Sequence, residues 1–192
     1  MDTRLLIPKP FLGYYPATVS QQEIEETVTI LSENSAEEKN CYTISPPKKT
    51  EPIAPRENYE TKNPLSLEIF DPRVNRPLGD IVLARSGDKG GNINIGLFVQ
   101  TAEQWEWFRS FMTKDRLRIL MRKDWKDWYC LERVEFEKIY AVHFVVYGPL
   151  GRGVTSSGLL DNLGKGFAEF IRAVHVDIPL KFLEDNVHMS NL

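Results

Sequence analysis

The stretch that decides the fold reads Ile81-Val82-Leu83-Ala84-Arg85-Ser86-Gly87-Asp88-Lys89-Gly90-Gly91-Asn92-Ile93-Asn94-Ile95-Gly96-Leu97-Phe98-Val99. Its apolar ends predict two strands, over residues 80–85 and 94–100, with a polar, glycine-rich loop between them. A solvated turn needs few polar side chains, whereas this loop has many. Its glycines also allow the backbone to adopt positive φ. Such a loop between two strands is where a binding or catalytic site is expected. Its candidate site residues are Arg85, Ser86, Asp88, Lys89, Asn92 and Asn94.

Strand and helix patterns follow one another along the chain after this stretch. Thr101 is placed to cap a helix that begins at Ala102, with Gln104 at the reach-back position. The elements expected next are a helix over 114–122, strands over 133–136 and 140–147, a glycine-rich loop over 148–158, a helix from 160 or 161 to 174, and a short strand over 176–179. Helices on one face of a largely antiparallel sheet are the simplest packing of this order. The pattern therefore predicts an α+β, ferredoxin-like sandwich.

Residues 1–77 differ in composition from the rest of the chain and hold most of its 12 prolines. Frequent proline excludes long helices and central strands, so we expect an extended Pro-rich arm ahead of a domain over 78–192. Within the arm, Ser20 and Glu23 have the spacing of a capping box, which predicts a short helix over 21–31. Residues 32–40 are expected to be flexible. The side chains expected to anchor the arm are Phe11, Leu12, Tyr14, Tyr15, Ile44, Tyr59, Leu65, Leu67, Ile69 and Phe70.

Composition argues against several kinds of partner. The formal net charge is −3 and the isoelectric point is about 5.7, so no basic field offsets phosphate repulsion, and nucleic acid is not expected to bind. No apolar run reaches the roughly 18–20 residues that span a bilayer, and no signal-peptide core opens the chain. Cys41 and Cys130 stand far apart, and no set of ligands has the spacing of a metal site. We therefore expect a reduced, cytoplasmic protein with no metal, no cofactor and no membrane contact.

A second glycine-rich loop follows the strand predicted over 140–147. Because this loop is expected to open a helix, its backbone N–H groups would attract an anion. Together with the first loop it forms a candidate site for a carbonyl, a carboxylate or another oxyanion. Neither loop has the spacing of a Walker A motif or of the dinucleotide fingerprint. The candidate substrate-binding residues here are Arg152, Thr155, Ser156 and Ser157, ahead of Asp161 and Lys165.

Three residues are candidates for acid–base chemistry. Asp88 and Lys89 have two interpretations: a turn cap beside a solvated ammonium, or an acid–base pair in which one group tunes the other. His143 lies in the predicted central strand, where it is either a core histidine bonded to a carbonyl or a side chain that points into the site. Ser86 has no local histidine and no Gly-x-Ser-x-Gly context, so it is assigned to substrate binding rather than to nucleophilic attack.

These residues carry a resemblance to a known family. Residues 84–90 with Asn94-Ile95-Gly96, and residues 151–154 with Ser156-Ser157, Asp161 and Gly164-Lys165, resemble the C-terminal domain of the AtuA-like family of acyclic terpene utilisation. The resemblance covers residues 78–184. It implies a ferredoxin-like fold and a role in terpenoid or acyl metabolism. Segments 141–144 and 176–183 look like those of fungal members, whose longer proteins carry a large N-terminal domain. The resemblance thus implies a free-standing module with its linker.

Three functions remain open. The first is a cofactor-independent enzyme of secondary metabolism, of the isomerase, cyclase or lyase type. In it, an acid–base residue moves a proton on a small apolar terpenoid, polyketide or acyl compound, and Arg152 with the loop hydroxyls holds the carbonyl or carboxylate oxygen of that compound. The second is a non-catalytic module that assembles homo-oligomers or partner subunits. The third is a domain that binds acyl-CoA or a nucleotide.

Overall fold

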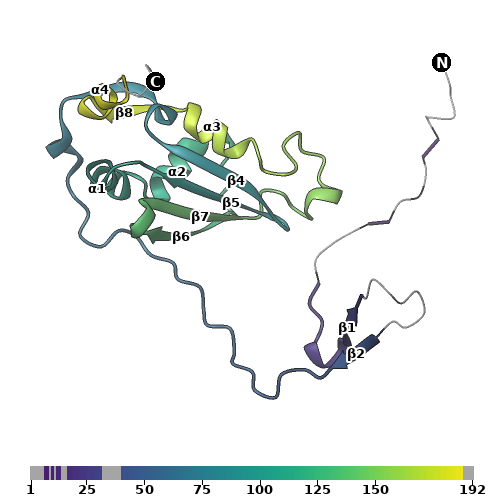
Figure 1. Ribbon diagram of the computed structural model, residues 1–192. Helices are drawn as coiled ribbons and strands as arrows, with labels where there is room; N and C mark the ends of the chain where they lie inside the picture. The colour runs from purple at the N-terminus through teal and green to yellow at the C-terminus, as the bar shows by residue number, and fades with distance from the viewer. Residues whose placement is uncertain (1–6, 9, 11, 14–16, 32–39, 188–192) are drawn as a thin grey trace. The chain divides into compact units, whose positions relative to one another are not determined.

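The computed structural model describes residues 7–8, 10, 12–13, 17–31 and 40–187. The chain divides into two compact units, one over residues 16–56 and one that includes residues 57–192 (Figure 1). The second unit therefore takes in residues 57–77, which the sequence pattern assigned to the arm. Phe70 and Thr61 are buried there, and the backbone N–H of Tyr59 donates to the carbonyl of Arg133 at 3.0 Å.

The smaller unit is a two-stranded antiparallel hairpin. Its strands are β1 (Glu26–Ile30) and β2 (Asn40–Ile44). The helix predicted over 21–31 is therefore wrong, since only Gln21–Glu23 forms a 3₁₀ turn and Ser20 makes no side-chain cap hydrogen bond. The consecutive β-branched residues of β1 lose side-chain freedom in a helix and fit a strand, and this preference outweighs the capping pattern.

The side chains expected to anchor the arm are buried only in part. Phe70 is buried, and Tyr59 and Leu67 are half-buried. The exposed ones are Leu12, Ile44, Leu65 and Ile69. Three more of these side chains lie outside the described residues: Phe11, Tyr14 and Tyr15. Residues 32–39, which belong to the segment expected to be flexible, also lie outside the described residues. The anchored part of the supposed arm thus includes Asn58, whose side-chain oxygen accepts the Arg133 N–H at 3.2 Å, and the residues that follow it.

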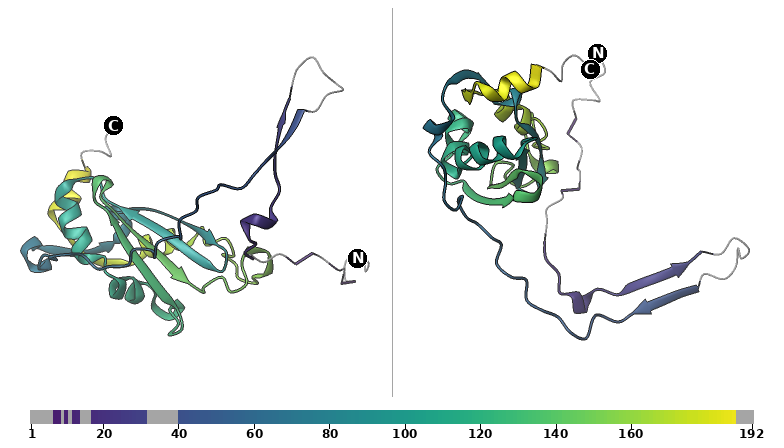
Figure 2. Two further views of the ribbon diagram at one scale, coloured as in Figure 1. Left: turned by 90° about the horizontal axis from the view of Figure 1, so that it is seen from below. Right: turned by 60° about the vertical axis from the view of Figure 1, so that its left-hand side comes forward.

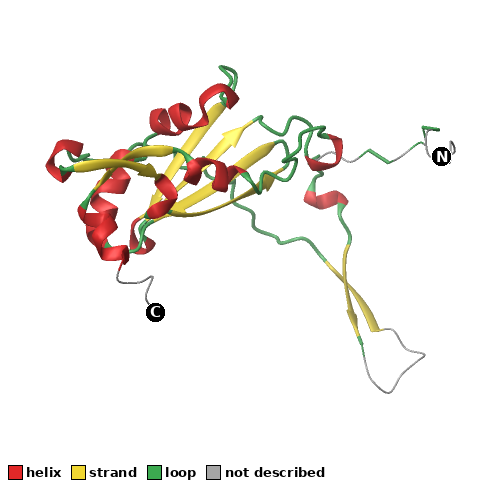
Figure 3. Cartoon of the chain, turned by 90° about the horizontal axis from the view of Figure 1, so that it is seen from above, coloured by secondary structure: helices red, strands yellow, loops and turns green. Residues whose placement is uncertain are grey.

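The larger unit is built on a four-stranded antiparallel sheet with the order β4-β5-β7-β6 (Figures 1 and 3). Its strands are β4 (Leu83–Lys89), β5 (Asn92–Phe98), β6 (Cys130–Phe136) and β7 (Ala141–Tyr147). The stretch predicted as a polar loop is thus mostly strand, because Lys89 pairs with Asn92 and leaves only Gly90 and Gly91 as the turn. Gly90 has a φ of 64°, which glycine adopts without strain.

Alternation along the strands divides their side chains between two faces of this sheet. One face is apolar: residues of β5 lie opposite residues of β7, and all of them are buried. These side chains are Ile93, Ile95, Leu97, Val142, Phe144 and Val146. The other face, called the open face below, carries Arg85, Asn94 and His143.

Four helices contribute buried residues to the same core cluster as the apolar face, which confirms that helices cover one face of the sheet. They are α1 (Ala102–Phe111), α2 (Lys114–Met121), α3 (Phe167–Ala173) and α4 (Lys181–Val187), the last through Phe182. Thr101 Oγ1 accepts the Gln104 N–H at 3.2 Å, so the predicted cap of α1 is also confirmed.

Helix α3 is shorter than the sequence predicted. It begins at Phe167, whereas the apolar pattern predicted a start at residue 160 or 161. Gly164 has a φ of 60°, which a right-handed helix does not allow, and Gly166 follows two residues later. Leu163 is accordingly 44% exposed rather than part of a buried helix face.

A second antiparallel pair completes the larger unit, and Figure 2 shows both of its sheets from two further sides. Strand β8 (His175–Pro179) confirms the predicted short strand, but its partner is β3 (Arg73–Pro77), which comes from the supposed arm. Val176 and Ile178 of β8 are buried in the core. Helix α4 (Lys181–Val187) follows.

Arg133 of β6 is fully buried and joins the segment before β3 to the domain. Its guanidinium donates to the carbonyls of Met112 at 2.9 Å, Arg109 at 3.0 Å and Tyr59 at 3.3 Å. Glu135 supplies the opposite charge, with Oε1 2.8 Å from Arg133 Nη2. A buried guanidinium is stable only when its charge is paired and its donors are bonded, and both conditions hold here.

We expect Arg133→Met to lower the free energy of unfolding by about 3–5 kcal/mol, because it removes the countercharge of Glu135 and the donor that the Met112 and Tyr59 carbonyls share. Urea unfolding followed by tryptophan fluorescence measures this change. The matched control is Arg118→Met, which removes an exposed partner of Asp115 and should change stability by about 0.5 kcal/mol or less. Equal effects of the two substitutions would contradict the structural role of Arg133.

Candidate functional site

The turn of the β4–β5 hairpin packs against the second glycine-rich loop. Leu150 N–H donates to Gly91 O at 2.9 Å. A β-carbon at Gly91 would collide with the carbonyl oxygen of Gly151, so the two backbones approach too closely for any side chain. Asn92 Oδ1 accepts the Gly148 N–H at 3.0 Å. Asn92, predicted to bind substrate, therefore joins the hairpin to the loop.

The second loop does not open a helix, so it lacks the row of free N–H groups that the sequence predicted. The loop itself contains a 3₁₀ turn over Val154–Ser156, and residues 160–163, where that helix was expected to begin, form a turn. Ser157 Oγ accepts the Leu159 N–H at 3.3 Å. The other predicted binding residues of this loop are exposed: Arg152, Thr155 and Ser156. The predicted oxyanion site between the two loops is therefore not enclosed.

Ser86 holds the start of α3 to β4. It is 8% exposed, and its hydroxyl donates to Gly164 O at 2.6 Å and accepts the Ala168 N–H at 2.9 Å. These bonds use the one proton of the hydroxyl and one of its two lone pairs, so Ser86 has a structural role at the start of α3. That Ser86 also binds substrate stays a prediction.

Asp88 and Lys89 lie on opposite faces of the sheet, since neighbouring residues of a strand alternate. Asp88 pairs with Ile93 and shares its face with the helices, whereas Lys89 lies on the open face. Lys89 Nζ donates to the backbone carbonyl of Asp88 at 2.8 Å, and among the described residues it makes no ion pair with the Asp88 carboxylate. The structure therefore does not assemble these two groups as a mutually tuned acid–base pair.

Other predicted residues do come together on the open face. Asn94 Nδ2 lies 3.3 Å from His143 Nε2, across neighbouring strands β5 and β7. Arg85 of β4 is directly opposite Gly96, and Gly96 is directly opposite His143. His143 is half-buried on this face and points away from the core. The structure thus places His143 on the open face rather than in the core, and its role in a site stays a prediction.

Two glycines make room on the open face. A β-carbon at Gly87 would lie 3.2 Å from Lys165 Nζ and 3.8 Å from Asn94 Oδ1, so the Lys165 ammonium occupies the space above Gly87. The nearest atom to a β-carbon at Gly96 would be His143 Cδ2, at 3.9 Å. The missing side chains thus leave room for polar groups of this face, to which the strand register adds Arg85. We call these four residues the open-face cluster: Arg85, Asn94, His143 and Lys165.

Sequence reasoning placed Lys165 only at the end of the second loop. Its position near β4 follows from Ser86, which accepts and donates hydrogen bonds at the start of α3 and so brings residue 165 to this edge strand. The sequence feature that indicates space for the Lys165 side chain is Gly87, which has no side chain and lies opposite Asn94 in the hairpin. This feature can be recognised only when the register of the strands is known.

The open-face cluster has the groups that proton transfer needs. With the Asn94 amide nitrogen as donor, His143 Nε2 is the acceptor, and the neutral ring carries its proton on Nδ1. Arg85 and Lys165 provide positive charge on the same face, and Glu132 of β6 adds a carboxylate there, opposite Val145. The arrangement can hold an oxyanion or carbonyl oxygen beside a titratable ring.

Apolar side chains continue the open face beyond His143. Leu83, Phe98 and Phe136 are 38%, 37% and 50% exposed. They lie in one row across the sheet with Ala141. The Phe136 ring meets the His143 ring edge-on, with the centroids 6.3 Å apart. One end of the open face is therefore polar and the other apolar, with His143 between them.

A separate groove of about 460 Å³ lies beside the second loop on the helix side of the sheet. Burial raises the pKa of the Tyr129 phenol, which lines the groove, and the negative charge of Asp124 raises it further. The phenol stays protonated and can donate a hydrogen bond. The lining is mostly apolar and includes Ile93, Met121, Leu150, Leu159 and Phe167.

Cys41 and Cys130 are free and exposed. Across the residues that the structure describes, no three His, Cys, Asp or Glu side chains gather as metal ligands would. Over the same residues, every helix is too short or too polar to cross a bilayer.

Comparison with known proteins identifies one family. The model of the AtuA ferredoxin-like domain matches residues 76–177, a little over half of the chain. The matched range runs from β3 to β8 and contains the whole four-stranded sheet. No curated protein and no solved structure matches the chain.

We expect Gly91→Ala to lower the free energy of unfolding by about 1–3 kcal/mol, because its β-carbon would collide with a backbone carbonyl that cannot move aside as a flexible side chain does. Gly158→Ala is the matched control, since a β-carbon there meets nothing within 4 Å. Thermal unfolding of the two variants measures the difference. A Gly91 variant as stable as the control would show that the hairpin and the loop are not in contact.

Proposed function

The chain belongs to the family of AtuA ferredoxin-like domains, and on this basis we propose that it is a cofactor-independent enzyme that moves a proton within a small, largely apolar metabolite. The observation that carries the proposal is the 3.3 Å contact between Asn94 and His143 on the open face, beside the Lys165 ammonium. The reaction class is isomerisation, cyclisation, dehydration or hydration, each of which needs a proton to leave one atom and reach another.

His143 is the group that exchanges the proton with the substrate. An imidazole changes its charge in the physiological pH range, so it can act as base in one step and acid in the next. In this tautomer the lone pair is on Nε2, so the substrate takes the place of Asn94 at Nε2 before it gives up its proton there. Asn94 fixes the ring orientation and its tautomer through the hydrogen bond to Nε2. A ring held in one orientation needs no rearrangement before proton transfer.

Arg85 and Lys165 hold the oxygen on which negative charge develops. Removing a proton next to a carbonyl places charge on that oxygen, and fixed cations nearby lower the barrier. Arg85 offers a planar fork of donors, and Lys165 offers a compact ammonium above Gly87. Their two positions on the open face suit a carbonyl or a carboxylate.

The apolar row of Leu83, Phe98 and Phe136 receives the carbon skeleton of the substrate. These side chains are partly exposed, so contact with an apolar ligand removes apolar surface from water. A terpenoid, polyketide or acyl compound with one carbonyl or carboxylate combines the two features that the open face offers. Asp88 stands outside this assignment because it faces the helices.

Proton transfer is measured most directly by deuterium exchange. The full chain is incubated in D₂O with a panel of terpenoid, polyketide and acyl carbonyl compounds, and mass spectrometry detects deuterium in each compound, including where net turnover is absent. We expect His143→Gln to slow exchange by about 10²–10⁴-fold, the usual contribution of general acid–base catalysis. Arg85→Gln is expected to weaken substrate binding.

Asp88→Asn is the matched control, since it removes a charge from the same hairpin but on the opposite face. It should leave the exchange rate within about twofold of the original, a difference of about 0.4 kcal/mol or less. Circular dichroism confirms that each variant is folded. A rate that falls with Asp88→Asn and persists with His143→Gln would overturn the assignment of the proton to His143.

As a second candidate function, we propose that the open face assembles two copies of this domain. The observation that favours it is the row of partly exposed apolar side chains, which a monomer leaves in contact with water. A second copy placed face to face would cover both rows. Such an arrangement has twofold symmetry, the commonest form of homo-oligomer.

Solution mass tests this second candidate. If the open face forms a dimer, Phe136→Glu should shift the mass measured by light scattering from the dimer to the monomer, because a buried unpaired charge opposes association. Ile69→Glu is the control, since Ile69 is also exposed but lies in the 3₁₀ turn before β3. A monomer at every concentration of the unmodified chain would rule the candidate out.

A further inference from the structure

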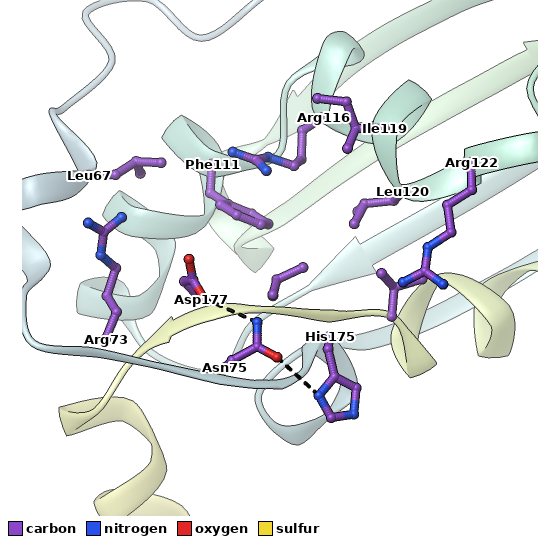
Figure 4. Close-up of a pocket in the computed structure, with 12 residues that line it drawn as sticks. Leu67, Arg73, Asn75, Phe111, Arg116, Ile119, Leu120, Arg122, His175 and Asp177 are labelled. Atoms are coloured by element: carbon purple, nitrogen blue, oxygen red, sulfur yellow. Dashed lines mark hydrogen bonds between the residues drawn. The ribbon is translucent and has the colours of Figure 1, made fainter.

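A cleft of about 270 Å³ lies between the β3–β8 pair and helices α1 and α2 (Figure 4). None of its lining residues belongs to the four-stranded sheet, so the cleft is separate from the open-face cluster. Figure 4 shows Arg73 and Arg116 on either side of the Phe111 ring and Arg122 at the other end of the cleft, beyond Leu120. Arg73 belongs to β3, whereas Arg116 lies in α2 and Arg122 follows its last residue. The apolar part of the lining includes Leu67, Ile119 and Leu120.

Arg116 rests on an aromatic stack. Its Cζ lies 4.5 Å from the centroid of the Phe111 ring, and that ring stacks on the buried Trp107 ring with the centroids 4.7 Å apart. A guanidinium over an aromatic face is stabilised by the ring quadrupole. Within the described residues no carboxylate pairs with Arg116, so its N–H donors are held in place without an opposite charge.

Arg122 ends helix α2 in a strained conformation. Its φ of 53° and ψ of −129° lie in a region that glycine adopts freely and other residues avoid. The backbone conformation at this position does not favour arginine over glycine. Over the part of the chain that the structure describes, Arg122 also lacks a carboxylate partner. The strain together with the unpaired charge points to a role for the side chain itself.

Two other charges line the cleft: Asp177 is hydrogen-bonded to a neutral amide and keeps its negative charge, whereas Arg73 is paired with a carboxylate outside the lining. Arg73 Nε donates to Asp71 Oδ1 at 2.6 Å. Asp177 Oδ1 accepts from Asn75 Nδ2 at 3.1 Å, and Asn75 Oδ1 lies 3.3 Å from His175 Nδ1. Positive charge therefore prevails where Arg116 and Arg122 face the cleft, although the chain as a whole carries a net charge of −3.

From this arrangement we infer that the cleft binds a small organic dianion, a phosphomonoester or a dicarboxylate, between Arg116 and Arg122. Planar guanidinium forks match the oxygens of both groups. The Phe111, Leu67 and Leu120 side chains contact the carbon part of the ligand. The cleft volume is close to the lower end of small-molecule sites, about 300–1,000 Å³, so it suits a metabolite rather than a dinucleotide. This site does not depend on the proposed proton transfer.

Calorimetric titration of the full chain tests the inference with three probes: phenyl phosphate, inorganic phosphate and succinate. The buffer contains 150 mM NaCl, which screens diffuse attraction between exposed charges. We expect saturable binding of phenyl phosphate or succinate. A preference for phenyl phosphate over succinate identifies a phosphate ester as the ligand class, and the reverse identifies a dicarboxylate. Inorganic phosphate should bind more weakly than phenyl phosphate because it has no carbon part to contact the apolar side chains of the cleft.

Substitutions locate the site. Arg116→Gln and Arg122→Gln should each weaken binding about tenfold or more, since each removes a charged fork. Arg118→Gln removes the same charge from the same helix, but Arg118 pairs with Asp115 and does not line the cleft. Its affinity should stay within about twofold of the original, since α2 keeps both cleft arginines. No saturable binding of any probe, or an equal loss in the Arg118 variant, would overturn the inference.

Arg122→Gly separates the ligand contact from the fold. Glycine adopts the backbone conformation of Arg122 without strain, so thermal stability should be kept or raised while affinity falls about tenfold or more. Unchanged affinity in this variant would show that the Arg122 side chain does not contact the ligand.

Discussion

The alternation of side chains across a pleated strand is the constraint on which this domain depends. In the four-stranded sheet it sends Ile93, Ile95 and Leu97 to the helices and leaves the intervening positions of β5 on the open face. The same rule separates Asp88 from Lys89, although they are neighbours in sequence. The polar, glycine-rich stretch can therefore form strand β4. The side chains on its open face need not be apolar, and as an edge strand it pairs with a neighbouring strand on one side only.

Two buried polar contacts connect this sheet to segments distant in sequence. Ser86 bonds the backbone at the start of α3 and so brings Lys165 to the edge strand. Arg133 bonds carbonyls of α1 and of the segment near Tyr59, with Glu135 as its countercharge. Each contact satisfies a group that burial would otherwise penalise. Together they explain why residues predicted to form an extended arm and a ligand-binding loop belong to the scaffold.

The two candidate sites use positive charge in different settings. On the open face, Arg85 and Lys165 share one side of the sheet with a histidine, so an oxygen bound there would lie on the same face as a group that can exchange a proton. In the cleft near α2, Arg116 rests on Phe111 and Arg122 is held in a strained turn, with no comparable proton-transfer group bonded to either. The open-face arrangement suits proton transfer, and the arrangement in the cleft suits binding of an anion. Because they lie on different elements, a ligand at one does not compete directly with a ligand at the other.

The sequence by itself determined the α+β class, the cap of α1, the central strand with His143 and the family, because these follow from local periodicity and motif. It failed for residues 21–31, where β-branched side chains outweighed a capping pattern, and for the start of α3, where the φ of Gly164 ended the helix early. Only the tertiary structure decided which polar residues share a site. Strand register and long-range backbone contacts joined Asn94 to His143 and Lys165, assigned Ser86 and Asn92 to structural bonds, and placed Asp88 among the helices. Those pairings depend on contacts between residues far apart in the chain, which no local pattern encodes.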